Sequence, residues 1–462
     1  MKNTSVINRI SVTSIALLYL LFRVANAYLV TPFYDEFDSP AYFKLELYPS
    51  FRTHGITLFF TLIKDEFLIS IFQAIVGSVV WIYLWISVIK ILNSFLSRIF
   101  FTFFFYLLGC SSVVIEHDSS ILSESLALSS TVYLIATAIN FYISEGKKQG
   151  SSIINFGVAI IWFSSTKSSN SLLAPLLILI FTWAIIKYYK NVYYILFGVI
   201  IFILGTFFFV NVLSSDITKT LTTSGTINNR LIFAENWKSQ LVKSGYPEKA
   251  FGTFEDYSKS NLGLPPDQAV VNLAEFKHWW KNGGDSFLLS FTAKNLDYAI
   301  LAPVALPFFS EDLNFRKSIL SGWSQGTDLT DEYRGFQNSI LERTLFWPDE
   351  PEKAYLALAI SVLILGVSLL LLNASGRTVE FSFFVQIIIL MLFWSYLNWW
   401  FGSKPADMAR HNLSAAILFK LIPLISLTLS VDKLTMRKKC DNIISHGSSD
   451  LIRTERATKW CH

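Results

Sequence analysis

Charge is what this 462-residue chain has little of, since only 16% of its residues are charged while 52% are hydrophobic. A soluble chain carries about 25% charged residues. Together with a mean hydropathy of +0.46, this composition excludes a soluble enzyme, a disordered protein and a nucleic-acid-binding module. The formal net charge of +4 is also too small to indicate a nucleic-acid partner.

Cysteine is scarce as well, and the three cysteines, Cys110, Cys440 and Cys461, lack the spacing of metal ligands. Aromatic residues are abundant, with 41 Phe, 13 Trp and 19 Tyr. The apolar residues gather in blocks of about 20, the length that crosses a hydrocarbon core of about 30 Å. The sequence therefore predicts an all-α polytopic membrane protein.

The apolar blocks predict about ten transmembrane helices, seven before a long polar stretch and three after it. The fifth and sixth are short, and a hairpin that dips partway into the membrane is an alternative for them. The expected spans are 10–30, 67–91, 99–115, 120–143, 153–165, 171–186, 192–213, 355–372, 381–400 and 415–431.

Lys and Arg residues in short loops are retained on the cytoplasmic side of a membrane. They all fall on one face if both termini are cytoplasmic, which predicts a multi-pass protein of the plasma (inner) membrane. The expected units are a seven-span module, 1–213, with an outer loop at 31–66, a mostly helical extracytoplasmic segment, 214–353, three spans within 354–431, and a cytoplasmic tail, 432–462. The basic residues are Lys2, Arg9, Lys90, Arg98, Lys147, Lys148, Lys187, Lys190, Arg377, Lys433, Arg437, Lys438 and Lys439.

Acidic residues crowd the outer ends of the early spans, whereas the span cores hold almost no charge. The first outer loop reads Tyr-Asp-Glu-Phe-Asp-Ser-Pro-Ala-Tyr over residues 34–42, and Glu-His-Asp forms the second outer turn at 116–118. Glu124 is expected one to two turns into the fourth span, where a carboxylate is costly and needs a partner. Basic residues at the same level are Arg52, Lys167, Arg410 and His411.

This pattern fits a site for a lipid-linked phosphate. A carboxylate at the membrane surface acts as a general base if partial burial raises its pKa. Two acidic residues also suit a hard divalent cation, Mg²⁺ or Mn²⁺, so Glu116 and Asp118 are candidate metal ligands, although two carboxylates hardly require one. Arg and Lys side chains match phosphate oxygens.

Simpler interpretations stay open for several of these residues. Asp35 and Asp38 are also ordinary residues of a solvated loop, and Glu36 is expected to face solvent. His117 fits a hydrogen-bonded turn residue, and Arg410 fits a side chain that snorkels to the surface or caps a helix.

The order of these motifs resembles the GT-C superfamily of membrane glycosyltransferases. The likeness rests on Asp38-Ser-Pro-Ala-Tyr42 after the first span, Leu-Ser-Glu124-Ser-Leu in the fourth, and Arg410-His411 before the last. It also includes the layout of seven spans, a long outer segment and further spans. The resemblance implies a polyprenyl-phosphate sugar donor and a glycan or lipid acceptor.

The resemblance also implies roles for individual residues. Asp38, or else Asp35, is the catalytic base, and Glu116 and Asp118 match an acidic pair that binds a metal in some branches and a basic residue in others. Arg52 resembles an Arg before the second span, although His54 replaces the expected proline. The donor phosphate would meet Arg410, His411, Lys167 or Arg52, with Glu124, His117 and Tyr42 in support.

Two other functions remain alternatives. A surface-polysaccharide polymerase or ligase also has many spans and one large outer loop, and would depend on loop residues such as Arg334 and Arg343. A lipid or solute transporter usually has ionisable residues or broken helices at the bilayer midplane. Here the charged span residues Arg23 and Glu124 lie near span ends, and no inverted repeat is visible.

Overall fold

The computed structural model describes residues 2–33, 39–43, 54–143, 150–188, 192–214, 216–251, 270–302, 351–401 and 413–446. Every regular element in these ranges is a helix, and their only β contact is an isolated parallel bridge between Phe33 and Ser120. The predicted all-α architecture is thus confirmed for the described residues. A helix satisfies its own backbone hydrogen bonds, which is what an apolar segment needs inside lipid.

Within these residues, seven helices are long and apolar enough to cross a membrane. They are α1 (Lys2–Leu29), α4 (Glu66–Ile89), α7 (Glu124–Tyr142), α10 (Val192–Ser214), α20 (Pro351–Ala374), α21 (Thr378–Phe401) and α23 (Leu413–His446). An eighth span results if α5 (Phe95–Gly109) is joined to the bent continuation Ser112–Ser119. The two segments predicted to be short are the apolar helices α8 (Gly150–Thr166) and α9 (Ser168–Tyr188).

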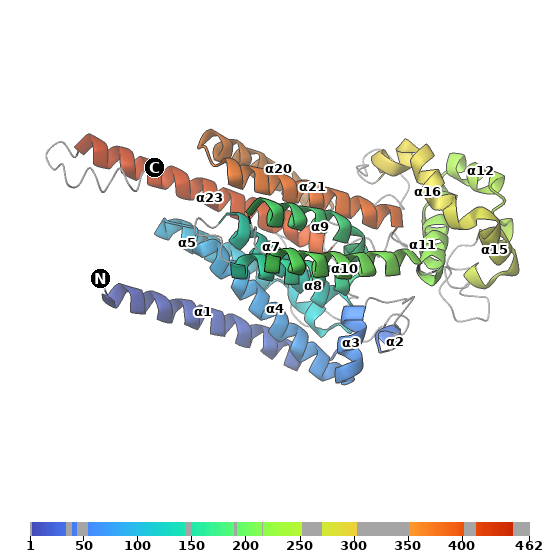
Figure 1. Ribbon diagram of the computed structural model, residues 1–462, viewed down its shortest axis with the longest axis horizontal. Coiled ribbons are helices and arrows are strands. Elements are labelled where there is room, and N and C mark those ends of the chain that lie inside the picture. The colour runs from blue at the N-terminus through green and yellow to red at the C-terminus, as the bar shows by residue number, and fades with distance from the viewer. Residues whose placement is uncertain are drawn as a thin grey trace.

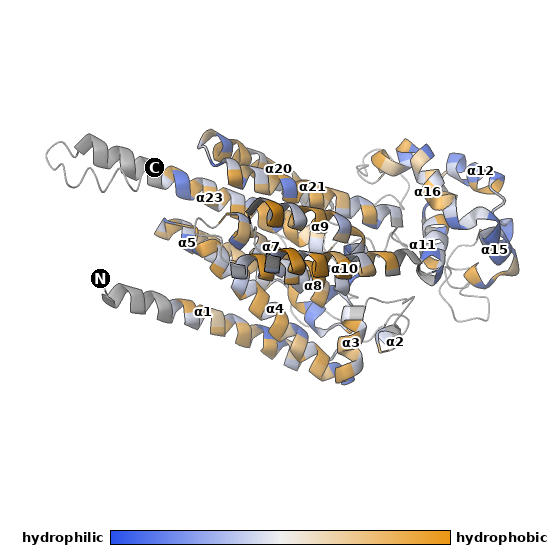
Figure 2. Ribbon diagram, viewed as in Figure 1, coloured by the Kyte–Doolittle hydropathy of each residue, from blue (hydrophilic) through white to orange (hydrophobic). Residues whose placement is uncertain are grey.

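The helices run along a common axis in an elongated bundle (Figure 1). The amino terminus and the end of α23 lie at one end of the bundle. The opposite end carries the short helices α2 (Ser39–Tyr42) and α3 (His54–Ile63). It also carries α11 (Asp216–Asn229), α12 (Glu235–Lys243), α15 (Ala274–Trp279) and α16 (Asp285–Lys294). We call this second end the loop end. Hydrophobic residues cover the bundle, while hydrophilic residues concentrate in α12 and α15 beyond it (Figure 2).

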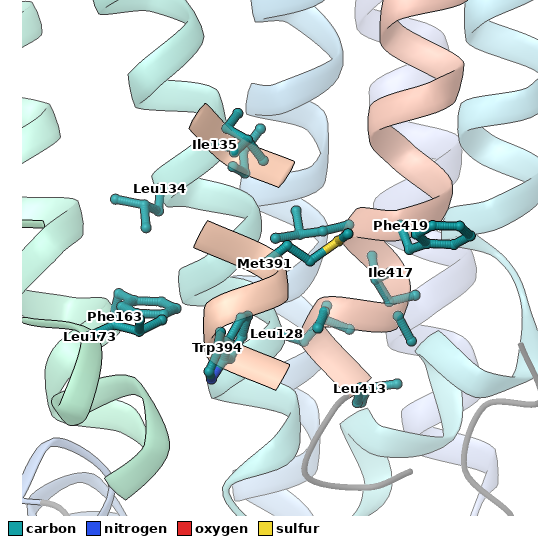
Figure 3. Packing of buried hydrophobic residues seen from close by; sticks show 14 of the residues in the cluster. Leu128, Leu134, Ile135, Phe163, Leu173, Met391, Trp394, Leu413, Ile417 and Phe419 are labelled. Carbon is teal, nitrogen blue, oxygen red and sulfur yellow. The ribbon is translucent and has the colours of Figure 1, made fainter. Parts of the chain in front are cut away.

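The core of the bundle joins early and late helices. Figure 3 shows Met391 and Trp394 of α21 among side chains of α7, α8 and α23, including Leu128 and Ile417. The rings of Phe163 and Trp394 meet edge to face with centroids 5.4 Å apart. The late spans α21 and α23 therefore pack directly on helices of the early module, and α20 packs against α21 and α23.

Two helix ends differ from the approximate bounds of the predicted spans. The fourth span was expected to begin at residue 120, but α7 begins at Glu124, because Ser120 is held in extended conformation by its bridge to Phe33. Glu124 is therefore in the first turn of the helix and not one to two turns into it. At the other end of the chain, α23 continues past residue 431 to His446, into the expected tail.

The described part of segment 214–353 is helical and has an aromatic core. Besides α11, α12, α15 and α16 it contains the 3-10 turns η2 (Leu231–Phe233) and η3 (Glu248–Ala250) and the π-helical turns η4 (Trp280–Gly284) and η5 (Asp297–Leu301). Tyr246 meets Trp279 edge to face at 5.0 Å, and Trp237 meets Tyr298 in the same way at 5.3 Å. This packing matches the expectation of a folded segment and not a linker.

Candidate functional site

The second predicted outer turn is a 3-10 helix, η1 (Glu116–Ser119), at the end of a broken span. The chain bends by 59° between α5 and the helix pair formed by α6 (Ser112–Ile115) and η1. The bend occurs at Ser111, whose extended backbone (φ −66°, ψ 148°) interrupts the helix. The break directs η1 across the neighbouring helices, so that Asp118 is only 1% exposed.

The buried carboxylate of Asp118 forms a two-pronged ion pair with Arg23 of α1. Arg23 Nε donates to Oδ2 at 2.8 Å, and Nη2 donates to Oδ1 at 2.8 Å and to Oδ2 at 2.6 Å. Ser125 Oγ donates to Oδ1 at 2.9 Å, and Arg23 Nη1 donates to the Tyr19 hydroxyl at 3.1 Å. Both charges are neutralised where neither reaches water, which is the condition for a buried ion pair to be tolerated.

Helix α4 shapes the space around this pair. Gln73 Nε2 donates to the carbonyl oxygens of Asp118 and Ser120, both at 2.9 Å, and so fixes the backbone of the turn. One helical turn later, Gly77 faces the Arg23 guanidinium so closely that a Cβ at this position would overlap it. The glycine therefore has a packing role: it leaves room for the cation between α1 and α4.

The first predicted outer loop is tied to the same turn from both sides. Phe33 N donates to Ser119 O at 2.8 Å, and Ile121 N donates to Phe33 O at 2.9 Å. On the other side of the loop, Ser39 Oγ donates to Ile121 O at 2.9 Å. The flanks of residues 34–38 are thus both bonded to the chain that follows Asp118.

A second buried ion pair involves Glu124, which follows Asp118 closely in the sequence. Lys167, between α8 and α9, donates from Nζ to Glu124 Oε1 at 3.0 Å, and the exposed fractions of the two side chains are 9% and 2%. Nearby, Ser165 lies against Gly55 at the start of α3, so the chain between α8 and α9 borders the loop end. Lys167 is therefore the partner that a carboxylate at the start of an apolar helix requires.

The carboxylate oxygens at η1 are poorly placed to coordinate a divalent cation. Both oxygens of Asp118 already accept hydrogen bonds from Arg23 or Ser125. Within the described ranges, no group of three or more His, Cys, Asp or Glu side chains has the spacing to hold a metal ion. The Arg23 guanidinium occupies the place beside Asp118 that a cation would take, so we derive no step through a metal.

Of the remaining predicted site residues, three lie in the described part of the chain and the others lie outside it. His117 is buried, with Nδ1 2.6 Å from Val113 O, as expected of a hydrogen-bonded turn residue. Tyr42 is buried against Phe60, with ring centroids 5.7 Å apart, in a small apolar cluster at the loop end. Glu116 is partly exposed at the start of η1. The others, Asp35, Asp38, Arg52, Arg410 and His411, lie outside the described residues, as do Arg334 and Arg343.

Three members of this arrangement have no role predicted from the sequence: Arg23, Gln73 and Ser125. For Arg23 a signal existed, because it is the only charged residue in the first candidate span, Ser11–Leu29, and a charge in an apolar helix needs a counter-ion. Gln73 and Ser125 carry no such signal, since single polar side chains are common in membrane helices. Their roles depend on which backbone and carboxylate atoms the fold brings within reach.

These features define the class of the protein. It is an all-α membrane-type bundle with two buried cation–carboxylate pairs, and the flanks of an acidic loop are bonded to the chain directly after Asp118. No family model, curated protein or solved structure was found to match the chain.

Proposed function

We propose that the protein is a membrane-embedded glycosyltransferase with a GT-C-like layout, which transfers a sugar from a polyprenyl-phosphate lipid to an acceptor hydroxyl at the loop end of the bundle. One observation carries the proposal. The flanks of the acidic loop 34–38, at Phe33 and Ser39, are bonded to residues 119–121, directly after the buried Asp118–Arg23 pair. The two described ends of the acidic loop are thus fixed beside a turn whose own charge is already neutralised by Arg23.

In the proposed reaction, Asp38, or else Asp35, accepts the proton of the acceptor hydroxyl while its oxygen attacks the anomeric carbon of the sugar. The bond from that carbon to the phosphate oxygen breaks, and the lipid phosphate leaves with the electron pair. The configuration inverts, and no sugar–enzyme bond forms. The phosphate is a stable anion, so nearby cations matter more to the rate than a general acid.

Asp118 and Arg23 are positioning residues in this scheme. Their pair is buried and mutually neutralised, so neither is available as the base or as the phosphate ligand. Together with Gln73 they fix the turn to which the acidic loop is bonded. The cations proposed to meet the donor phosphate are Lys167, Arg410, His411 and Arg52. Lys167 must then exchange Glu124 for the phosphate.

The proposal places the loop end outside the cytoplasm, because the short Lys- and Arg-rich loops belong to the other end. Nucleotide sugars are absent there, which makes a lipid-linked donor the chemically reasonable choice. The protein would then lie in the plasma membrane with both termini in the cytoplasm.

The test is transfer of sugar by the purified chain carrying Asp38→Asn or Asp35→Asn, with Glu36→Gln as the matched control. We expect at least one Asp variant to lose about 10²- to 10⁴-fold in rate, the contribution of a positioned base, and the Glu36 variant to retain activity. Mass spectrometry of cell-surface glycans with and without the gene would identify the sugar and the acceptor.

Full activity in both Asp variants would remove the proposed base. If Arg334→Met and Arg343→Met then abolished activity, a polysaccharide polymerase or ligase would replace the proposal. Movement of lipid in proteoliposomes without a new glycosidic bond would instead indicate a transporter.

A further inference from the structure

A third buried cation lies at the junction between α11 and α21. Arg230, between α11 and η2, is 6% exposed. Its Nη1 donates to the carbonyl oxygen of Trp399, near the end of α21, and its guanidinium lies 4.3 Å from the centroid of the Trp399 ring. These two contacts fix the orientation of the guanidinium without offsetting its full charge.

Apart from the Tyr298 hydroxyl, which interacts with the guanidinium, the other edge of Arg230 has no acceptor among the described residues. Neither Nε nor Nη2 of Arg230 makes a hydrogen bond, and no carboxylate in the described ranges forms an ion pair with it. Arg23 provides the comparison within the same chain, because it binds both oxygens of Asp118 through its Nε and Nη2 edge. An uncompensated buried charge is strongly destabilising. The described residues therefore supply no oxyanion to the same edge of Arg230.

Tyr298 provides a second donor at this point. Its ring is fully buried and packs against Trp237 and Trp399. Its hydroxyl lies beside the Arg230 guanidinium and interacts with it, and no atom of the described residues accepts the hydroxyl proton in a hydrogen bond of normal geometry. Burial raises the pKa of Tyr298, so that the hydroxyl keeps its proton and is able to donate it to a hydrogen bond.

Three aromatic side chains place this junction at the level of the membrane surface. Tyr396 donates to Ile300 O at 3.1 Å, Trp399 to Tyr298 O at 3.3 Å, and Trp400 to Ala299 O at 2.9 Å. Tyr and Trp at the end of an apolar helix are typical of the headgroup region. Ile300 and Leu301 of η5 are 49% and 65% exposed beside them. The oxyanions that abound at this depth are the phosphates of lipids.

We propose that Arg230 and Tyr298 bind the phosphate group of a membrane lipid, with Nε and Nη2 of Arg230 each donating to one phosphate oxygen. The site itself does not depend on a transferase activity. Its identification with the phosphate of the sugar donor rests on the proposed function, and it adds a residue of the 214–353 segment to the cations considered above.

The test measures binding by the full-length chain in phosphatidylcholine nanodiscs. The probes are a polyprenyl monophosphate, the corresponding polyprenol without phosphate, and inorganic phosphate. The variants are Arg230→Met, Arg230→Lys and Tyr298→Phe, with Arg377→Met as the control. We expect the wild type to bind the lipid phosphate and not the alcohol, and Arg230→Met to weaken binding about 10- to 100-fold, as loss of charge-assisted hydrogen bonds implies.

The two sources of phosphate are separated by the third probe. Saturation by inorganic phosphate at the same affinity would assign a free phosphate to the site, whereas preference for the prenyl probe assigns a lipid. Arg230→Lys retains the positive charge but lacks the planar guanidinium that donates to two phosphate oxygens at once, so this variant should also bind the lipid phosphate less tightly. The Arg377 variant should bind like the wild type, because Arg377 is paired with Glu380 at the start of α21.

Thermal unfolding without any probe separates a binding role from a structural one. If Arg230 serves a ligand, Arg230→Met should melt at or above the wild-type temperature, because an uncompensated buried cation has been removed, and should lose the stabilisation that the probe gives to the wild type. A lower melting temperature without the probe together with wild-type affinity would overturn the proposal, as would failure of the wild type to bind either phosphate. If Arg230→Met does not fold, Arg230→Lys and Tyr298→Phe decide the question by the same criteria.

Binding is measured without transfer, which keeps this proposal distinct from the proposed function. If no sugar is transferred but binding of the lipid phosphate depends on Arg230, the proposed phosphate site is supported and the proposed glycosyltransferase activity is refuted.

Discussion

Arg23 and Asp118 are 95 residues apart in sequence and meet through three hydrogen bonds of 2.6 to 2.8 Å, with both side chains 1% exposed. The pair joins the first span to the turn after the broken span, and the flanks of the acidic loop are bonded to the chain beyond that turn. The pair therefore contributes to the stability of the early module and holds the turn to which Phe33 and Ser39 are bonded.

We expect Arg23→Met to lower the free energy of unfolding by about 3–5 kcal/mol, because it leaves the Asp118 carboxylate buried without a counter-ion. The double variant Arg23→Met with Asp118→Leu should recover most of this loss, since no charge then remains. Denaturant- or heat-induced unfolding in detergent measures both effects.

The control for this prediction is Arg377→Met, which breaks the more exposed pair with Glu380, 3.3 Å apart. That change should be within about 1 kcal/mol of the wild type. Equal losses in Arg23→Met and in the double variant would show that Arg23 stabilises the fold through its packing and not through its charge.

Gly77→Ala should also destabilise the protein, by about 1–3 kcal/mol, because the added methyl group overlaps the Arg23 guanidinium. Gly366→Ala is the matched control, since a Cβ at Gly366 meets nothing within 4 Å. Comparison of their melting temperatures measures the effect. If the two variants melted alike, the close approach of α1 and α4 at Gly77 would be refuted.

The Glu124–Lys167 pair predicts opposite effects of two neutral substitutions on binding of a polyprenyl phosphate. Glu124→Gln releases Lys167 from its carboxylate and should tighten binding, whereas Lys167→Gln removes the cation and should weaken it about 10-fold. Binding to nanodiscs that contain the phosphate lipid is the measurement.

The polyprenol without phosphate is the reference ligand for this pair of variants, and neither substitution should change its binding. Effects of the same sign in both variants would assign Lys167 a purely structural role as the counter-ion of Glu124. The phosphate would then have to be met by the other cations.

A chelator should leave sugar transfer intact if Arg23 takes the place of a cation beside Asp118. Activity is compared with and without EDTA, and then with added Mg²⁺ or Mn²⁺. Loss of activity on chelation that Mg²⁺ restores would return Glu116 and Asp118 to the role of metal ligands together with residues outside the described ranges.

The sequence predicts which polar residues belong to the site, but not which of them form ion pairs with one another. The acidic turn 116–118 and the cation Lys167 were singled out because polar residues near the ends of apolar spans must be solvated or paired. Glu124 was expected to need a partner, and the structure identifies that partner as Lys167. The sequence does not predict Arg23 as the ion-pair partner of Asp118, because several Arg and Lys residues are expected at the same level of the membrane and nothing in the sequence selects one of them.

The sequence by itself determined that the chain is a helical membrane-type protein, because hydropathy is a local property and a helix satisfies the hydrogen bonds of its own backbone. Only the tertiary structure decided which charges meet. That choice depends on the break at Ser111, on the room that Gly77 leaves between α1 and α4, and on the extended bridge between Phe33 and Ser120. Each of these joins segments distant in sequence, and an ion pair forms only when both of its charges are packed within reach.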